Sequence, residues 1–188
     1  KSVWVFFSQF SKTAVFQSDK LIVASLIDPA VTTILVFSKK GADLMNTVVI
    51  QISHALMPGL ANLVGQGEVI KLKKYMINAI KYSIMFSMFT SGGILLLNKQ
   101  FVSLWVGENY YGGTLLTILI VCSSLIYVLN TVLYNNLFAN GEIVFTSKAS
   151  MLESLIRIPL SIILCYYLGI NGVVLAIIIA VMSTSLFS

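Results

Sequence analysis

Long apolar segments, most of them with one charge or none, follow one another through nearly the whole of this chain. A helix of about 20 apolar residues matches the ~30 Å hydrocarbon core of a bilayer. Charged residues make up only 10% of the 188 positions, whereas a soluble domain carries roughly 25%. The sequence therefore predicts an all-α, polytopic bundle of about six transmembrane helices that forms a single domain over residues 1–188.

Breaks between the apolar segments define the expected helices. Asp28-Pro29 is a helix stop, Pro58-Gly59 is expected to bend or end the second span, and Gly92-Gly93 lies near the expected end of the third. The six predicted spans are 3–27, 31–64, 72–97, 114–138, 145–168 and 172–187.

The connections between these spans differ in charge. The connection at 65–74 is the richest in lysine, and the turn at 139–148 also carries a lysine. The connections at Asp28-Pro29, 98–113 and 169–172 together contain only Lys99 as a basic residue. The positive-inside rule places lysine-rich connections in the cytoplasm. We therefore expect a protein of the bacterial inner membrane, with both ends of the chain on the cytoplasmic side.

Several classes of protein are disfavoured by what the sequence lacks. It has no basic run, so nucleic acid is not an expected partner. It has no phosphate-binding glycine loop, zinc-type spacing or nucleophile elbow, so we do not expect an enzyme. His54 is the single histidine, and Cys122 and Cys165 lie in apolar segments, where small buried residues are expected. No metal or cofactor is expected.

Charged residues inside the spans need either a partner or a wet cavity, because each costs ~2.5–3.5 kcal/mol at the bilayer centre. The charges that the connections between the spans cannot accommodate are Asp19, Lys20, Lys39, Lys40, Asp43, Glu153 and Arg157. In the second span a polar stripe continues at helical steps through Lys39, Asp43, Thr47, Gln51, His54 and Pro58, with Asn46 and Asn62 at or near its edges. Such a face should line water or a polar neighbour.

Three other spans have weaker polar stripes. These are Ser8, Ser11, Lys12, Val15 and Ser18 in the first span, with Asp19 beside them; Thr117, Ser124, Tyr127, Thr131 and Tyr134 in the fourth; and Ser150, Glu153, Ser154, Arg157 and Ser161 in the fifth. Together they predict a central cavity in which cations exceed anions, suited to an anionic solute.

A structural interpretation of the same residues stays open. Hydroxyl and amide side chains often join helices without any role in transport. Glu153 and Arg157 are spaced to pair with each other on one helix. Asp19 and Lys20 can equally neutralise charges on other helices, and His54 fits a satisfied polar residue better than a proton carrier.

Five segments, in order and covering nearly the whole chain, resemble the MATE-like MOP superfamily and its polysaccharide-export branch. They are DKLIVASLI at 19–27, ALMPGLANLVGQGE at 55–68, LWVGENY at 104–110, LFANGE at 137–142 and YYLGINGVVLA at 166–176. The resemblance implies a flippase for lipid-linked oligosaccharides, with two six-helix lobes facing a V-shaped cavity. The chain is similar to the second lobe, so the lipid bilayer, the glycolipid and a missing N-terminal lobe are the expected partners.

The resemblance also implies roles for individual residues. Related lipid II flippases have an Asp in the first helix of this lobe, matched by Asp19. They have a cavity-facing Arg in the second, at or next to Lys39, and a lysine there loses the planar fork that grips phosphate in two places. We expect Lys39, Lys40 and Arg157 to attract the diphosphate. Asn46, Gln51 and Tyr127 are expected at the sugars, and Asp19 and Asp43 are candidates for ion coupling.

Two other functions are alternatives. Drug and metabolite exporters of the same superfamily are expected to favour acidic and aromatic cavities, which the lysines disfavour. An integral-membrane polysaccharide polymerase or acyltransferase needs a concentrated site, and here the predicted outer loops are short.

Overall fold

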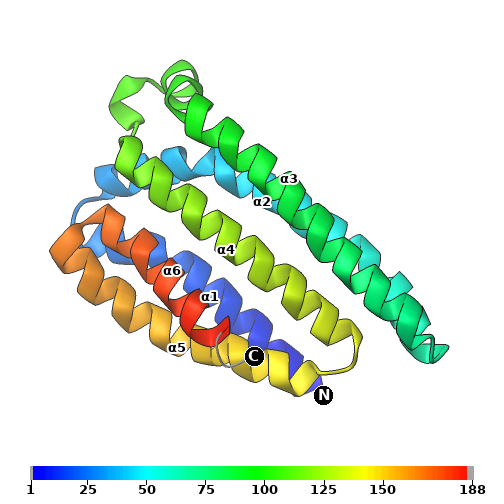
Figure 1. The fold of residues 1–188 in the computed structure, drawn as a ribbon. Helices are drawn as coiled ribbons and strands as arrows, with labels where there is room; N and C mark the ends of the chain where they lie inside the picture. Colours follow the sequence, from blue (N-terminus) through cyan, green and yellow to red (C-terminus); the bar gives the residue numbers. More distant parts are fainter. Residues whose placement is uncertain (1, 186–188) are drawn as a thin grey trace.

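The fold is seen in a computed structural model that describes residues 2–185; within that range the side chains of residues 2–5, 8, 12 and 185 are not described. The predicted stripe members Ser8 and Lys12 are therefore outside the described side chains. The elements are α1 (Ser2–Leu26), α2 (Pro29–Gly65), α3 (Val69–Trp105), the 3₁₀ turn η1 (Glu108–Tyr110), α4 (Thr114–Ala139), α5 (Ile143–Leu168) and α6 (Ile170–Ser185). This confirms the expected all-α bundle of six helices (Figure 1).

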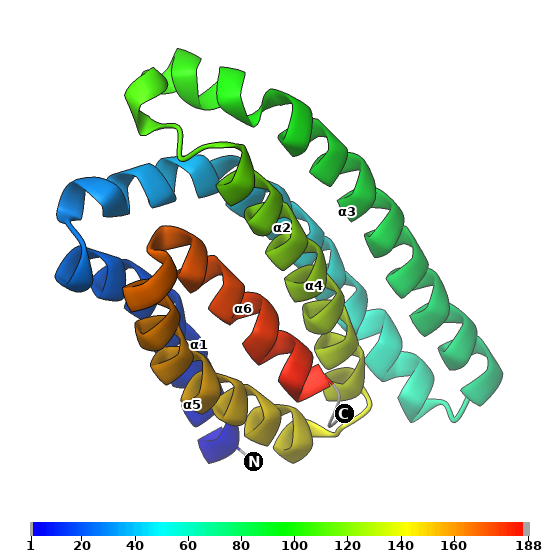
Figure 2. The same ribbon diagram turned by 60° about the vertical axis from the view of Figure 1, so that its left-hand side comes forward.

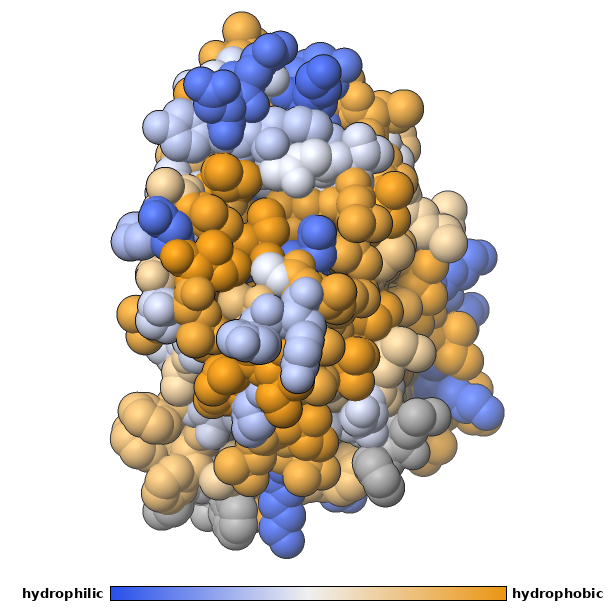
Figure 3. Space-filling view, turned by 90° about the vertical axis from the view of Figure 1, so that its left-hand side faces the viewer, coloured by the Kyte–Doolittle hydropathy of each residue, from blue (hydrophilic) through white to orange (hydrophobic). Residues whose placement is uncertain are grey.

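Four of these helices, α2, α3, α4 and α5, are long and apolar enough to cross a membrane. The apolar part of α6 is shorter, and α1 is not one of the four in the described part of the chain. The architecture is therefore compatible with a membrane protein. Apolar side chains cover most of the face seen in Figure 3, and hydrophilic side chains gather mainly toward its edges.

The helices form two groups (Figures 1 and 2). Helices α1 and α6 both pack on α5, whereas α2, α3 and α4 pack on one another. The contact of α4 with α6 joins the two groups, and α4 touches α5 only slightly. This arrangement leaves a seam between α1 and α5 on one side and α2 and α4 on the other.

The main apolar core closes one end of this seam. It joins α1, α2, α4, α5 and α6 near the α1–α2 and α5–α6 connections, through buried side chains that include Val23, Leu35, Leu116, Cys165 and Val173. The opposite end holds the α2–α3 and α4–α5 turns. The lysine-rich connections at 65–74 and 139–148 therefore lie at the end away from the core.

The third helix is longer than the sequence indicates, since it continues past Gly92-Gly93 to Trp105. Buried contacts stabilise the added turns. Asn98 Nδ2 donates to the Ser38 carbonyl at 3.0 Å and to Thr117 Oγ1 at 3.2 Å. The rings of Phe37 and Trp105 meet edge to face, with centroids 5.5 Å apart. The expected loop at 98–113 is thereby shortened to 106–113.

Other local features follow from close packing. α2 continues through Pro58 to Gly65, so this proline does not end the helix. Gly172 permits the tight turn between α5 and α6, because a Cβ there would lie 1.9 Å from the Leu164 carbonyl oxygen. Cys165 is buried as expected, but Cys122 is exposed, because its position on α4 faces away from the other helices.

Candidate functional site

Three neighbouring cavities follow the seam between the two helix groups and together form what we call the polar groove. Their volumes are about 580, 140 and 250 Å³. Phe16 lines all three. Ile50, Tyr127 and Arg157 line both the first and the second, while Lys39 and Asp43 are among those that line both the second and the third. The shared walls place the three cavities next to one another along the bundle.

The third cavity carries the positive charge of the groove. Lys20 from α1 and Lys39 and Lys40 from α2 line it, together with the carboxylates Asp19 and Asp43. Three ammonium groups thus share this cavity with two carboxylates, of which Asp19 is already bonded to Arg157. We call this part the cationic compartment.

Phe16 lies between two of these lysines. The Lys20 Nζ is 5.3 Å and the Lys39 Nζ 5.7 Å from the centre of its ring. Both distances are within the range of cation–π attraction. The half-exposed ring thus holds ammonium groups of α1 and α2 close together despite their repulsion.

A buried ion pair lies between α1 and α5. Arg157 Nη2 donates to Asp19 Oδ2, and both side chains are almost fully buried. The pairing removes most of the positive charge that Arg157 was expected to offer a solute, and it supports the structural alternative for Asp19. The predicted roles of Arg157 in binding and Asp19 in ion coupling stay predictions.

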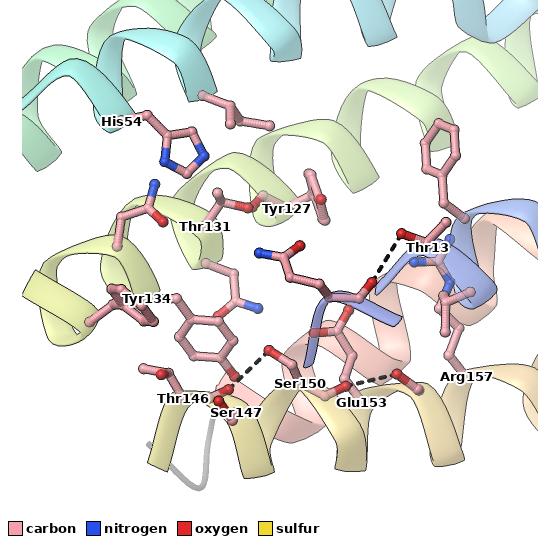
Figure 4. Close-up of a pocket in the computed structure, with 18 of the residues that line it drawn as sticks. Thr13, His54, Tyr127, Thr131, Tyr134, Thr146, Ser147, Ser150, Glu153 and Arg157 are labelled. Carbon is pink, nitrogen blue, oxygen red and sulfur yellow. Dashed lines mark hydrogen bonds between the residues drawn. The ribbon is translucent and has the colours of Figure 1, made fainter. Parts of the chain in front are cut away.

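The first cavity is the largest of the three, and most of the residues that line it are neutral and polar. Figure 4 shows Tyr127, Thr131 and Tyr134 of α4 facing the same space as Ser150 and Glu153 of α5, with Thr13 of α1 and His54 of α2 at its sides. Asn130 and Asn135 also line it. The Asn130 Oδ1 is buried and accepts no hydrogen bond from the described part of the chain. We call this part the neutral chamber.

Part of the predicted α2 stripe lines the groove. Lys39, Asp43 and Thr47 line the smaller cavities, and His54 lines the neutral chamber. Asn46 and Tyr127 line the second cavity, where Asn46 Nδ2 donates to Ser124 Oγ at 3.1 Å. Gln51 is exposed and is not among the lining residues of these three cavities.

Some residues of the groove were not anticipated from the sequence. Phe16 looks like an ordinary apolar residue of a membrane helix, and no spacing rule singles it out. Asn130 and Asn135 left a usable signal, because an asparagine within an apolar span needs a polar partner. Asn135 has such a partner, since its Nδ2 donates to the buried Ser53 hydroxyl at 3.0 Å. Thr117, a member of the predicted stripe in the fourth span, belongs instead to the separate hydrogen-bond group around Asn98.

Among the side chains that the structure describes, no three of His, Cys, Asp or Glu are placed to hold a metal ion. The functional groups of the site are therefore ammonium, guanidinium, carboxylate, hydroxyl and amide groups. They can bind a polar solute through charge and hydrogen bonds.

Comparisons with protein-family models, with curated proteins and with solved structures found no match for this chain. What the fold defines is a class: a helical bundle compatible with the membrane, with a row of adjoining polar cavities between two groups of helices.

Proposed function

We propose that this chain is one lobe of a transporter that moves an undecaprenyl-diphosphate-linked oligosaccharide across the inner membrane. The observation that carries the proposal is that the cationic compartment and the neutral chamber lie in one row, with the second cavity sharing walls with both. A lipid-linked oligosaccharide has an anionic diphosphate, which matches the cationic compartment, attached to neutral sugars, which match the neutral chamber. The resemblance of five sequence segments to polysaccharide-export flippases supports the same class.

The cationic compartment provides the attraction for the diphosphate. Lys39 and Lys40 are better placed for this than Arg157, because Arg157 is already bonded to Asp19. Hydrogen bonds in which one partner is charged are roughly twice as strong as neutral ones. Asp43 lowers the net charge of the compartment, so that the diphosphate is attracted but can still be released.

The neutral chamber suits the sugars. Its volume of about 580 Å³ is within the range of small-molecule sites, ~300–1,000 Å³. Tyr127 and Tyr134 offer ring faces, and Thr131, Asn130 and Ser150 offer hydrogen-bonding groups. This arrangement would tolerate different sugars, because few of its groups are charged.

The two ends of the groove differ. The apolar core closes the end near the α1–α2 and α5–α6 connections, and the neutral chamber lies toward the end that carries the lysine-rich turns. With that end in the cytoplasm, as the positive-inside rule predicts, this is an inward-facing state. Rocking against a second lobe would close this end and open the other, as in alternating access.

Export of cationic drugs is the alternative that one observation favours, namely Glu153 and two tyrosines lining the largest cavity. A matched pair of assays separates the two functions. The full-length protein, expressed in a strain that lacks its own glycan flippase, should restore surface polysaccharide and leave tolerance of cationic drugs unchanged. Raised drug tolerance without surface polysaccharide would contradict the proposal and favour the exporter.

An assay on the purified protein addresses the enzyme alternative. Purified full-length protein, incubated with a lipid-linked oligosaccharide in detergent, should return the glycolipid chemically unchanged. Chain extension or acylation of the sugar would contradict the transporter proposal.

A further inference from the structure

Two helices extend well beyond the rest of the bundle. α2 and α3 have 37 residues each, whereas α4 and α5 have 26. Asn140, which caps the end of α4, has its Nδ2 3.7 Å from the Met76 sulfur of α3. The start of α3, from Val69 to Tyr75, therefore extends past the α4–α5 turn by about 10 Å at 1.5 Å per residue. With the end of α2 it forms a projecting hairpin, the α2–α3 arm (residues 60–75), seen in Figure 1.

The arm is basic, and its charges are exposed. Lys71, Lys73 and Lys74 are all exposed on its α3 side, and Glu68 is its single acidic residue. Glu68 is bonded to Lys71 at 3.0 Å. Neither Lys73 nor Lys74 forms an ion pair within residues 2–185 of the structure. Lys81 is also exposed, about 10 Å along the helix from Lys74 on the other side of the Met76 level.

The positions of Lys74 and Lys81 along α3 match the expected depth of the lipid headgroups. A helix of 26 residues such as α4 is about 39 Å long, so its ends pass the ~30 Å hydrocarbon core and reach the headgroups. Asn140 marks that depth on α3 through its contact with Met76. Lys74 lies just outside it, and Lys81 lies inside it, where a long side chain can extend back to the interface.

We propose that the α2–α3 arm is a binding site for the headgroups of anionic phospholipids on the lysine-rich side of the membrane. Ammonium groups above and below the phosphate layer can each contact a phosphate, and basic residues near an anionic leaflet contribute about 1 kcal/mol each. This site is separate from the polar groove and does not depend on what the groove transports. Its effect would be to hold the turn between the two longest helices at the membrane surface.

An acidic protein is the other occupant to consider, because Val69 and Ile70 are 70% and 85% exposed at the tip of the arm. The distribution of the lysines favours lipid. Lys81 lies below the level of the α4–α5 turn, at a depth that a soluble partner could not reach. A protein partner would require the basic residues to gather at the tip alone.

The test is the affinity of the detergent-solubilised protein for phosphatidylglycerol and for phosphatidylcholine, measured by native mass spectrometry. The variant Lys73→Gln/Lys74→Gln removes two positive charges from the arm. The control Lys99→Glu changes the net charge by the same amount at the opposite end of α3. At about fivefold for each lysine, the arm variant should bind phosphatidylglycerol roughly 25-fold more weakly, while the control changes by less than twofold and phosphatidylcholine binding stays the same in both.

Unchanged phosphatidylglycerol affinity in the arm variant would overturn the proposal, and the lysines would then be left for an acidic protein partner. An equal loss in the arm variant and in Lys99→Glu would also overturn it, because that result reflects net charge rather than a site. Helix content by circular dichroism should match the parent protein in both variants, since all three side chains are exposed.

Discussion

Replacing both Lys39 and Lys40 with alanine in the full-length protein is expected to reduce glycan export at least a hundredfold. Both lysines line the cationic compartment with Lys20. A hydrogen bond to a charged group contributes about 1.5–3 kcal/mol, which is roughly tenfold or more in rate for each contact made in the rate-limiting state. The measurement is the initial rate of surface polysaccharide synthesis after induction of the variant in a flippase-deficient strain.

Matched substitutions separate attraction from general damage. Lys39→Arg/Lys40→Arg keeps both charges and should retain most of the activity. Lys99→Ala removes an exposed lysine that does not line the cationic compartment, and it should have no effect. Equal amounts of each protein in the membrane must be verified by immunoblotting. Normal export by the Lys39→Ala/Lys40→Ala protein would mean that these cations do not act on the transported molecule.

The second large effect concerns the buried pair of Asp19 and Arg157. Substitution Arg157→Met should lower the free energy of unfolding by about 3–5 kcal/mol, because it leaves the Asp19 carboxylate buried without its cation. Removing both charges in Asp19→Leu/Arg157→Met should recover most of the loss. The measurement is reversible unfolding in mixed micelles, followed by circular dichroism.

Lys20→Met is the control for this series, because Lys20 adjoins Asp19 in sequence but is only half-buried and lies near Phe16. Its effect on stability should stay below about 1 kcal/mol. A double variant as unstable as Arg157→Met alone would contradict a simple structural pair. Export by the double variant then separates the two roles of Arg157: retained export indicates a structural pair, and lost export in a stable protein indicates direct participation in transport.

The sequence was sufficient for the architecture, because apolar length and helix-stopping residues determine where membrane helices can form. It was also sufficient for the stripe on α2, since Lys39, Asp43 and Thr47 recur at helical spacing and do line the groove. The end of α3 could not be predicted, because the turns beyond Gly92-Gly93 are held by contacts that Asn98 makes with other helices.

Contacts between side chains of different helices could not be predicted from the sequence either. Arg157 has a carboxylate one turn away on its own helix, so local spacing favoured Glu153, yet it bonds to Asp19 through the packing of α1 against α5. Gln51 fits the helical spacing of the stripe but lies outside the three cavities. Helical spacing defines a face of α2, but the packing of the other helices determines which residues of that face line a cavity. The position of Phe16 between two lysines likewise depends on how α1 meets α2.

The proposed transport requires water in the groove of the membrane-embedded protein, and thiol labelling measures directly whether water reaches it. In a background in which Cys122 and Cys165 are replaced, single cysteines are placed at Thr47, which lines the groove, and at Met88, which is 64% exposed on α3 outside it. A negatively charged, water-soluble thiol reagent added to inside-out vesicles should label Thr47→Cys quickly and Met88→Cys hardly at all, because lipid covers the latter. Equal and slow labelling at both positions would contradict a water-filled groove.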